Sequence, residues 1–368
     1  MKQPILSLCV PTYNRAILLE RLLFSIIRQM PEDGTIELVV SDNCSTDGTK
    51  EVLERASAKT PYLRWSTNPT NVGFAMNVVN ATKLASGAYC LWVGDDDVFI
   101  DGALKYYLEK ITAHQNCDWF AINFYEVLQA DLDNGNVLEP DFCRQKLWKL
   151  RLPDVCERNF ETWEKAIEVP GGVDLEFYFA IFACIFRRTA VTEVLSKVDP
   201  RRCQYNPLEG WLYTEEAYYI HTFLLIEALP ERPGMILPEP FYVQGIGTTR
   251  GDDSGKVSFP YTVMPNLWIW VYPQVWSHIS SRCVFEHAQL ERLSHRMFYP
   301  CLKQLQDRAF KKKSIFASRM QGVSYLWSIR YMLVKYPLET IKFSKNLLPT
   351  SYIDTVSALK RSVRRLIK

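Results

Sequence analysis

The first 130 residues repeat one pattern, a short apolar run followed by a segment whose apolar residues recur at helical spacing. The apolar runs are ILSLCV (5–10), IELVVSD (36–42), YLRWS (62–66), AYCLWVG (88–94) and DWFAINFYEV (118–127). The helices are predicted after Asn14, which we expect to cap the first of them, and over 48–58, 73–85 and 101–113. Repeated strand–helix units of this length predict an α/β fold, a mixed and mainly parallel Rossmann-like sheet with helices on both faces.

The pattern is less regular after about residue 135. The run LEFYFAIFACIFRR (175–188) predicts a long strand, and helices are expected near 189–197 and 215–227. Helical patterns dominate from 265 onward. We therefore predict a catalytic domain over 1–260, with halves 1–130 and 131–260, and a helical, basic C-terminal region over 261–368.

Composition excludes several classes of protein. Hydrophobic residues make up 48% of the chain and charged residues 23%, which excludes a disordered or collagen-like chain. No run of 18 or more apolar residues is present, so no bilayer-spanning helix is predicted. The opening MKQPILSLCVPTYNR predicts a strand rather than a secretory signal. Ten cysteines without a CxxC pair argue against a zinc site and favour a reducing, cytoplasmic compartment.

The charge of the chain is unevenly distributed. Residues 303–368 hold 15 Lys or Arg against 3 Asp or Glu, a net charge of +12, whereas the whole chain has only +2. The last 18 residues also place five apolar side chains in a stripe beside Arg and Lys: Ile353, Val356, Leu359, Val363 and Ile367. This pattern predicts a basic amphipathic helix on an anionic membrane surface; the alternative is a helix packed on the catalytic domain. No nucleic-acid-binding motif is present.

Polar residues follow the first four predicted strands. Ligands of such sheets bind beyond the carboxyl ends of the strands. Asp95, Asp96 and Asp97 directly follow the run LWVG, and three adjacent carboxylates repel one another unless a cation or solvent relieves them. Oxygen ligands of this kind suit Mg²⁺ or Mn²⁺. The alternative is a solvated acidic turn that caps the helix over 101–113.

The other strand ends carry candidate contacts for a nucleotide. Asp42 could accept hydrogen bonds from a base or a ribose, and its alternative role is to cap a helix, for which Asp47 and Ser45 are better placed. Thr12, Tyr13 and Arg15 could contact a nucleotide, and their alternative is turn chemistry after Pro11. Asn71 and Gly73, taken alone, favour an ordinary loop.

Together these motifs carry a resemblance. SLCVPTYNRAILLERLLFSI, ELVVSDNCSTDGT, NPTNVGFAMN and LWVGDDDVFIDGAL resemble, in order and spacing, family 2 glycosyltransferases of the GT-A fold over about residues 4–125. The resemblance implies a nucleotide-sugar donor, a divalent metal (Mn²⁺ or Mg²⁺) and transfer to an acceptor hydroxyl, usually with inversion. It also implies the donor-binding residues Pro11, Thr12, Tyr13, Arg15, Asp42, Asn71, Asp95 and Asp96, and a metal site at Asp96 and Asp97.

The sequence departs from the family pattern at two positions. The family run often reads Asp-x-Asp-Asp, and aligning its last two aspartates to Asp96 and Asp97 puts Gly94 at the first. The assignment of metal and ribose contacts within 95–97 therefore stays open. The family also often has Arg where this chain has Met76, before Asn77, so that one contact to the donor is lost or comes from another Arg.

Inverting transfer needs a general base near the acceptor hydroxyl. The resemblance implies an acidic pair at a helix start about 100 residues beyond the metal site, where Glu215 and Glu216 open a helical pattern. Glu216 takes the second position and is preferred; Asp174 and Glu176 are held in reserve. The alternative is that acidic residues favour the first helical turn. The Q-x-x-R-W run of processive synthases is absent, which argues against polymerisation.

The sequence therefore predicts a glycosyltransferase that adds one sugar to a lipid-linked surface-glycan intermediate, such as O-antigen or capsule. Arg250, in a turn-rich loop, could reach the donor phosphates or lie in a solvated turn. We expect a cytoplasmic protein, peripheral on the inner membrane. Two alternatives remain: an inactive sugar-nucleotide-binding or scaffold protein, and a nucleotidyltransferase, although CVPTYNR is not a glycine-rich phosphate loop.

Overall fold

The computed structural model describes residues 3–132, 138–145, 148–203, 214–246 and 271–297. The chain divides into two compact units. The larger contains Met1–Gln204, Glu216–Pro260 and Arg282–Val284, and the smaller contains Tyr205–Glu215, Tyr261–Ser281 and Phe285–Lys368. The division near 260 lies close to the predicted domain boundary, but Tyr205–Glu215 groups with the later part of the chain.

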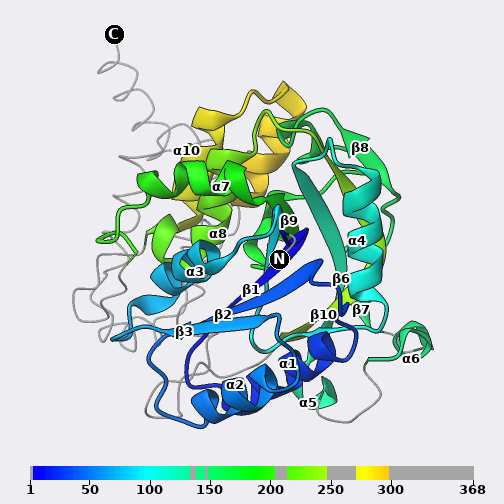
Figure 1. Ribbon diagram of the computed structural model, residues 1–368. Helices are drawn as coiled ribbons and strands as arrows, with labels where there is room; N and C mark the ends of the chain where they lie inside the picture. Colours follow the sequence, from blue (N-terminus) through cyan, green and yellow to red (C-terminus); the bar gives the residue numbers. More distant parts are fainter. Residues whose placement is uncertain (1–2, 133–137, 146–147, 204–213, 247–270, 298–368) are drawn as a thin grey trace, which may run out of the picture. The chain divides into compact units, whose positions relative to one another are not determined.

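The larger unit is built on a mixed sheet of ten strands among the described residues (Figure 1). The strands are β1 (Leu6–Thr12), β2 (Ile36–Asp42), β3 (Leu63–Thr67), β4 (Tyr89–Trp92), β5 (Val98–Phe99), β6 (Trp119–Leu128), β7 (Lys149–Leu150), β8 (Arg158–Phe160), β9 (Cys184–Arg187) and β10 (Gly234–Ile246). Their order is β3-β2-β1-β4-β9-β6-β10-β5, with β7 beside β6 and β8 beside β10. The first four strands are parallel to one another, whereas β9 is antiparallel to both of its neighbours.

Helices cover both faces of the parallel part of the sheet. Among the described residues of both units, the α-helices are α1 (Ala16–Ile27), α2 (Thr49–Ser57), α3 (Gly73–Leu84), α4 (Ala103–Ala113), α5 (Gln129–Leu132), α6 (Pro140–Gln145), α7 (Arg188–Val194), α8 (Glu215–Ala228) and α10 (Tyr272–Arg282). In Figure 1, α1 and α2 lie side by side on one face of β1–β3, and α3 lies on the other. All residues of β1 and β2 are therefore buried, as their continuous apolar runs predict.

The predicted α/β fold, a mixed and mainly parallel sheet with helices on both faces, is confirmed. Most early elements lie within two residues of their predicted bounds. β10 is longer than the FYVQ run indicates and pairs with β6 along most of its length. The pairing register shifts between Leu237 and Tyr242, across Pro238 and Pro240. Because proline has no backbone N–H to donate, the ladder is interrupted there.

Two local predictions were wrong. The segment 175–188 is not one long strand: it contains the 3₁₀ helix η2 (Leu175–Phe179) and then the short strand β9. Asp174 accepts a hydrogen bond from the backbone N of Phe177 at 2.8 Å and so starts a helical turn, while the aromatic side chains that suggested a strand fill the core. Elsewhere in the described residues, 3₁₀ helices form at η1 (Glu164–Ala166) and η3 (Leu195–Lys197).

The second correction concerns Asn14, which does not cap α1. Its φ is +50°, in the left-handed region that asparagine tolerates, and its Oδ1 accepts a hydrogen bond from the backbone N of Thr46 at 2.8 Å. Asn14 therefore ties the loop after β1 to the loop after β2. The first helical N–H group, that of Ala16, is instead satisfied by Asp47 Oδ2 at 3.0 Å.

The described residues of the smaller unit are mainly helical. They include all but the last residue of α10 and a helical segment over 287–297. None of the helices in the described ranges is both long and apolar enough to cross a bilayer. The predicted amphipathic helix over 351–368 lies outside the described residues.

Candidate active site

The carboxyl ends of β1 and β2 bring two of the predicted residues together. Thr12 pairs with Asp42 in the parallel register, and Asp42 pairs in turn with Thr67 on β3. On the other side of β1, the backbone N of Val93 donates to Cys9 O at 2.9 Å, which carries the chain into the aspartate loop. The ends of the four parallel strands therefore meet at one edge of the sheet, as their polar sequences predict.

Arg15 connects this edge to the aspartate loop. Its Nη1 lies 2.7 Å from Asp95 Oδ1 and 3.2 Å from Asp96 Oδ2. Thr12 Oγ1 donates to the other oxygen of Asp95 at 2.8 Å. Burial alone would lower the pKa of Arg15, but the charges of Asp95 and Asp96 raise it above its ordinary value. Two carboxylates therefore converge on a single cationic group.

Asp97 has different surroundings from its two neighbours. Its side chain points into the protein, where Oδ2 accepts from the Tyr242 hydroxyl at 2.7 Å and Oδ1 from the backbone N of Gly245 at 2.9 Å. The residue is only 2% exposed, and burial raises its pKa well above the ordinary value. Gly94 is required nearby, because a Cβ at that position would lie 2.4 Å from Asp97 Oδ2.

Asn77, on α3, is a residue at this edge whose role the sequence analysis missed. Its buried amide donates to the carbonyl oxygens of Thr12 (3.2 Å) and Ser41 (3.0 Å). Its Oδ1 accepts from the Ser41 hydroxyl at 2.7 Å and from Asn68 Nδ2 at 2.9 Å. Asn77 thus holds the ends of β1 and β2 and the loop after β3 together. The available signal was its place in the run NPTNVGFAMN.

The remaining donor candidates occupy the loops at the same edge. Asp42 is buried, and its Oδ1 accepts from the backbone N of Ser45 at 3.1 Å. Asn71 is exposed, and its Oδ1 accepts from the backbone N of Gly73 at 2.9 Å, at the start of α3. Pro11 is buried within β1, whereas Tyr13 is half-buried in the loop that follows. Arg250 lies outside the described residues.

The two acidic residues that begin α8 are held by different partners. Arg202 Nε and Nη2 donate to the two oxygens of Glu216, Nη2 at 3.0 Å. Within the smaller unit, the Glu215 oxygens lie 3.0 and 3.1 Å from His278 Nδ1. Sequence reasoning identified neither Arg202 nor His278, because each lies away from its glutamate along the chain.

The reserve candidate Asp174 has a structural role as well. It accepts from Arg151 Nη2 at 2.9 Å and also from the start of η2. These bonds account for its half-buried position in structural terms. The side chain of the other reserve, Glu176, lies outside what the structure describes.

The aspartate loop provides two carboxylates that could hold a cation. Within the described ranges, no cluster of three or more His, Cys, Asp or Glu side chains is arranged around a common point. Asp95 and Asp96 nevertheless both face Arg15 Nη1, so a positive charge is already accommodated between them. Both oxygens of Asp97 are taken by protein donors. Both oxygens of Asp95 are likewise held, by Thr12 and Arg15. The predicted metal pair, Asp96 with Asp97, therefore stays a prediction, and Asp96 is the only half-buried member of the described aspartate run.

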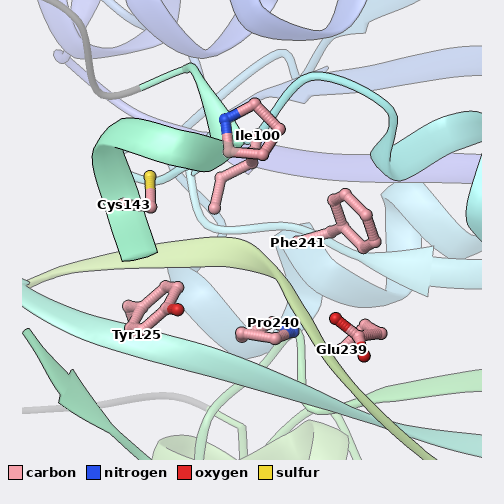
Figure 2. A pocket seen from close by; sticks show the side chains of 7 residues that line it. Ile100, Tyr125, Cys143, Glu239, Pro240 and Phe241 are labelled. Atoms are coloured by element: carbon pink, nitrogen blue, oxygen red, sulfur yellow. The ribbon is translucent and has the colours of Figure 1, made fainter. Parts of the chain in front are cut away.

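A small apolar pocket lies elsewhere in the larger unit (Figure 2). It is lined by Ile100, Tyr125, Pro140, Cys143, Glu239, Pro240 and Phe241, and its volume is about 20 Å³. Such a space holds about one water molecule, whereas small-molecule sites typically measure about 300–1,000 Å³. This pocket is therefore a packing gap beside an apolar cluster and not a donor site.

Comparison with known proteins finds a family model that the first part of the chain matches. Residues 7–169 match the model of glycosyl transferase family 2. The abequosyltransferase RfbV of Salmonella typhimurium is 37% identical over 119 residues, which cover 31% of this chain and 35% of that protein. A GalNAc(5)-diNAcBac-PP-undecaprenol beta-1,3-glucosyltransferase of Campylobacter jejuni is 35% identical over 108 residues, 29% of this chain and 34% of that protein. The chain thus matches about a third of the length of these relatives.

Solved structures support the fold over a longer stretch. Residues 1–349 of Staphylococcus aureus TarS, in complex with UDP-GlcNAc, superpose with a TM-score of 0.53 and 18% sequence identity. The match covers 96% of this chain and 83% of that one. At this identity the likeness concerns the fold alone.

Proposed function

We propose that this chain, whose residues 7–169 match the model of glycosyl transferase family 2, transfers one sugar from a nucleotide-sugar donor to an acceptor hydroxyl in the synthesis of a bacterial surface glycan. The observation that carries the proposal is the convergence of Asp95 and Asp96 on one cationic group at the carboxyl edge of the sheet. The names of the matched relatives, an abequosyltransferase and a glucosyltransferase acting on an undecaprenol-linked glycan, support this class of reaction.

The donor would lie across the ends of β1 and β2. Asp42 is our candidate for the contact to the base or ribose, beside Pro11, Thr12 and Tyr13, with Asn71 at the rim. Arg15 would contact the diphosphate, because its guanidinium already lies at the aspartate loop and phosphate oxygens are strong acceptors for it. Arg250 is a second candidate for the same contact.

The proposed enzyme requires Mn²⁺ or Mg²⁺, held by Asp95 and Asp96. Support comes from the two carboxylates facing one cation and from the partly open position of Asp96, whose side chain is 17% exposed. When bound, the ion would neutralise negative charge on the leaving diphosphate. Asp97 would have a positioning role. Its bonds to Tyr242 and Gly245 fix the turn that carries Asp95 and Asp96.

We propose that Glu216 is the general base of an inverting transfer. A base must accept the proton of the acceptor hydroxyl while the hydroxyl oxygen attacks the sugar. The contact with Arg202 keeps the Glu216 carboxylate in one orientation, which supports a positioned group. Glu215 is the alternative, with His278 as its partner.

The acceptor is proposed to be a lipid-linked glycan at the cytoplasmic face of the inner membrane. The support is the net charge of +12 over residues 303–368 and the undecaprenol-linked glycan in the name of one relative. Cationic segments near an anionic bilayer gain about 1 kcal/mol for each Lys or Arg.

A nucleotide-sugar screen tests the proposed function. Thermal midpoints would be measured with UDP-, GDP-, CDP- and dTDP-sugars, each with and without Mn²⁺. A donor at 100 times its Kd stabilises the folded protein by about 2.7 kcal/mol, so one donor should stand out. We expect that shift to be larger with Mn²⁺. If no nucleotide sugar shifts the midpoint under either condition, the proposed function is wrong.

A further inference from the structure

Helix α1 exposes large apolar side chains on its outer face. Ile17 is 83% exposed and Phe24 is 56% exposed. Seven residues are close to two helical turns, so these two side chains lie on the same side of the helix. The opposite side of α1 buries Leu19, Leu22 and Ile26 in the core. An amphipathic surface helix normally presents polar residues to solvent, and α1 departs from that pattern.

The exposed side chains border a groove between α1 and α2, the two helices that lie side by side in Figure 1. Its volume is about 570 Å³. Leu23, Val52 and Ala56 are buried residues that line it. The groove is therefore large enough for several methylene groups, unlike the pocket of Figure 2.

Cationic side chains surround the groove. Arg28, Arg55 and Lys59 line it, together with Arg21, whose Nη2 donates to the carbonyl oxygen of Asp96. Glu20 is the acidic residue among the lining side chains, and it pairs with Arg55 at 2.8 Å. Arg28 lies over the Phe24 ring, 5.6 Å from its centroid, and also pairs with Asp101 at 3.1 Å. Four cations against these two carboxylates leave the rim positive.

We propose that the α1–α2 groove is a docking site for anionic phospholipid at a membrane surface. Its apolar walls fit acyl chains, and its cationic rim complements the phosphate of the headgroup. Ile17 and Phe24 would enter the boundary between headgroups and chains, while Arg28 and Lys59 stay at the level of the phosphates. The inference concerns a surface of the described fold and does not rest on the proposed transfer reaction.

Charge argues against a second copy of the chain as the occupant. A symmetric dimer through this face would bring two positive rims together, and like charges across an interface oppose association. A lipid headgroup supplies the missing negative charge. The position of the groove also fits, because Ile17 lies two residues from Arg15, which contacts the aspartate loop. A bilayer bound here would lie beside the edge of the sheet where the candidate site is.

Vesicle binding by the full chain tests this docking site. Flotation would compare vesicles of phosphatidylglycerol and phosphatidylethanolamine with vesicles of phosphatidylcholine alone. The test variants are Ile17→Ser combined with Phe24→Ser, and separately Lys59→Glu. The matched controls are Val284→Ser, at an apolar side chain that is 87% exposed, and Lys50→Glu, on α2 but not lining the groove.

We expect the double variant to bind anionic vesicles about tenfold more weakly, because two apolar side chains lose their burial. Lys59→Glu should weaken binding at low salt and have less effect at high salt. Both controls should stay within about twofold of the unchanged chain. All substituted side chains are at the surface, and unchanged thermal midpoints would verify folding.

Three results would overturn the proposal. The first is equal vesicle binding by the unchanged chain and the double variant, which would leave any binding to another segment such as the basic C-terminal region. The second is equal binding to anionic and phosphatidylcholine vesicles. The third is a dimer in solution that the double variant dissociates, since the groove would then be an interface between copies of the chain.

Discussion

The hydroxyl of Tyr242 lies 2.7 Å from Oδ2 of Asp97, although 145 residues separate them in the sequence. Through this bond β10 fixes the turn that holds the aspartate run. The carboxylate is buried, so removing its donor leaves an oxygen without a partner. The bond therefore links the stability of the sheet to the geometry of the candidate site.

Tyr242→Phe should consequently lower the free energy of unfolding. Leaving a buried acceptor unsatisfied costs about 1–3 kcal/mol. Urea denaturation of the full chain would measure the change. Tyr62→Phe is the matched control, because its hydroxyl bonds to the Glu32 carbonyl at the protein surface and should matter much less. Equal effects of the two substitutions would contradict the assigned role of Tyr242.

Replacing Arg15 by Gln tests whether Asp95 and Asp96 form a cation site. The substitution removes the charge between two carboxylates, and hydrogen bonds to charged groups are worth about 1.5–3 kcal/mol. We expect a lower thermal midpoint that millimolar Mn²⁺ partly restores, with a larger Mn²⁺ shift than in the unchanged chain. Arg55→Gln, which breaks an exposed ion pair with Glu20, serves as the control. Identical Mn²⁺ shifts in all three proteins would argue against a cation site.

His221 gives the stability of the larger unit a defined pH dependence. Burial lowers its pKa to about 4, from an ordinary value of 6.5. The unfolded chain therefore binds a proton that the folded protein excludes between pH 6.5 and 4. Stability is full above pH 6.5 and falls as the pH drops through this window, by a total of about 3 kcal/mol. In His221→Gln this contribution should disappear. The free energy of unfolding, measured at pH 7 and at pH 4.5, should therefore differ less in the variant than in the unchanged chain. If the free energy of unfolding depends on pH in the same way in the unchanged chain and in His221→Gln, the role assigned to His221 is wrong.

Glu216→Gln should lower kcat for transfer by about a hundredfold or more while the donor Kd stays the same. The reason is that an amide cannot accept the proton of the acceptor hydroxyl. Arg202→Gln is the comparison variant. It removes the contact that orients Glu216 but keeps the carboxylate that would accept the proton, so it separates loss of orientation from loss of the base. If Glu215→Gln abolishes transfer and Glu216→Gln does not, the base is Glu215.

The sequence indicated much of the larger unit because its information there is local. Continuous apolar runs such as IELVVSD describe strands buried on both faces, and β2 occupies that same range, Ile36–Asp42. Polar residues just after these strands were expected to meet at one edge. Thr12, Arg15, Asp95 and Asp96 do meet there, because parallel strands in register bring their ends together.

The features that the sequence did not reveal depend on distant partners. Asp97 looks the same as Asp96 in the sequence, and only the pairing of β10 with β5 and β6 brings Tyr242 to one and not to the other. Likewise, the aromatic run 175–188 has the composition of a strand, but the hydrogen bond from Phe177 N to Asp174 turns it into η2. The apolar composition of 175–188 correctly indicates that the segment is buried. Its conformation, however, is set by the local hydrogen bond to Asp174.

The most direct test of the central claim is the release of nucleoside diphosphate from the nucleotide sugar that the screen identifies. It would be measured with Mn²⁺ for the unchanged chain and for Asp96→Ala, whose partly exposed side chain can be removed without unfolding the protein. We predict that the unchanged chain releases the diphosphate and that Asp96→Ala, with an unchanged thermal midpoint, is at least about a hundredfold slower. Equal rates for the two proteins, or release of pyrophosphate instead, would contradict a glycosyltransferase that acts at Asp95 and Asp96.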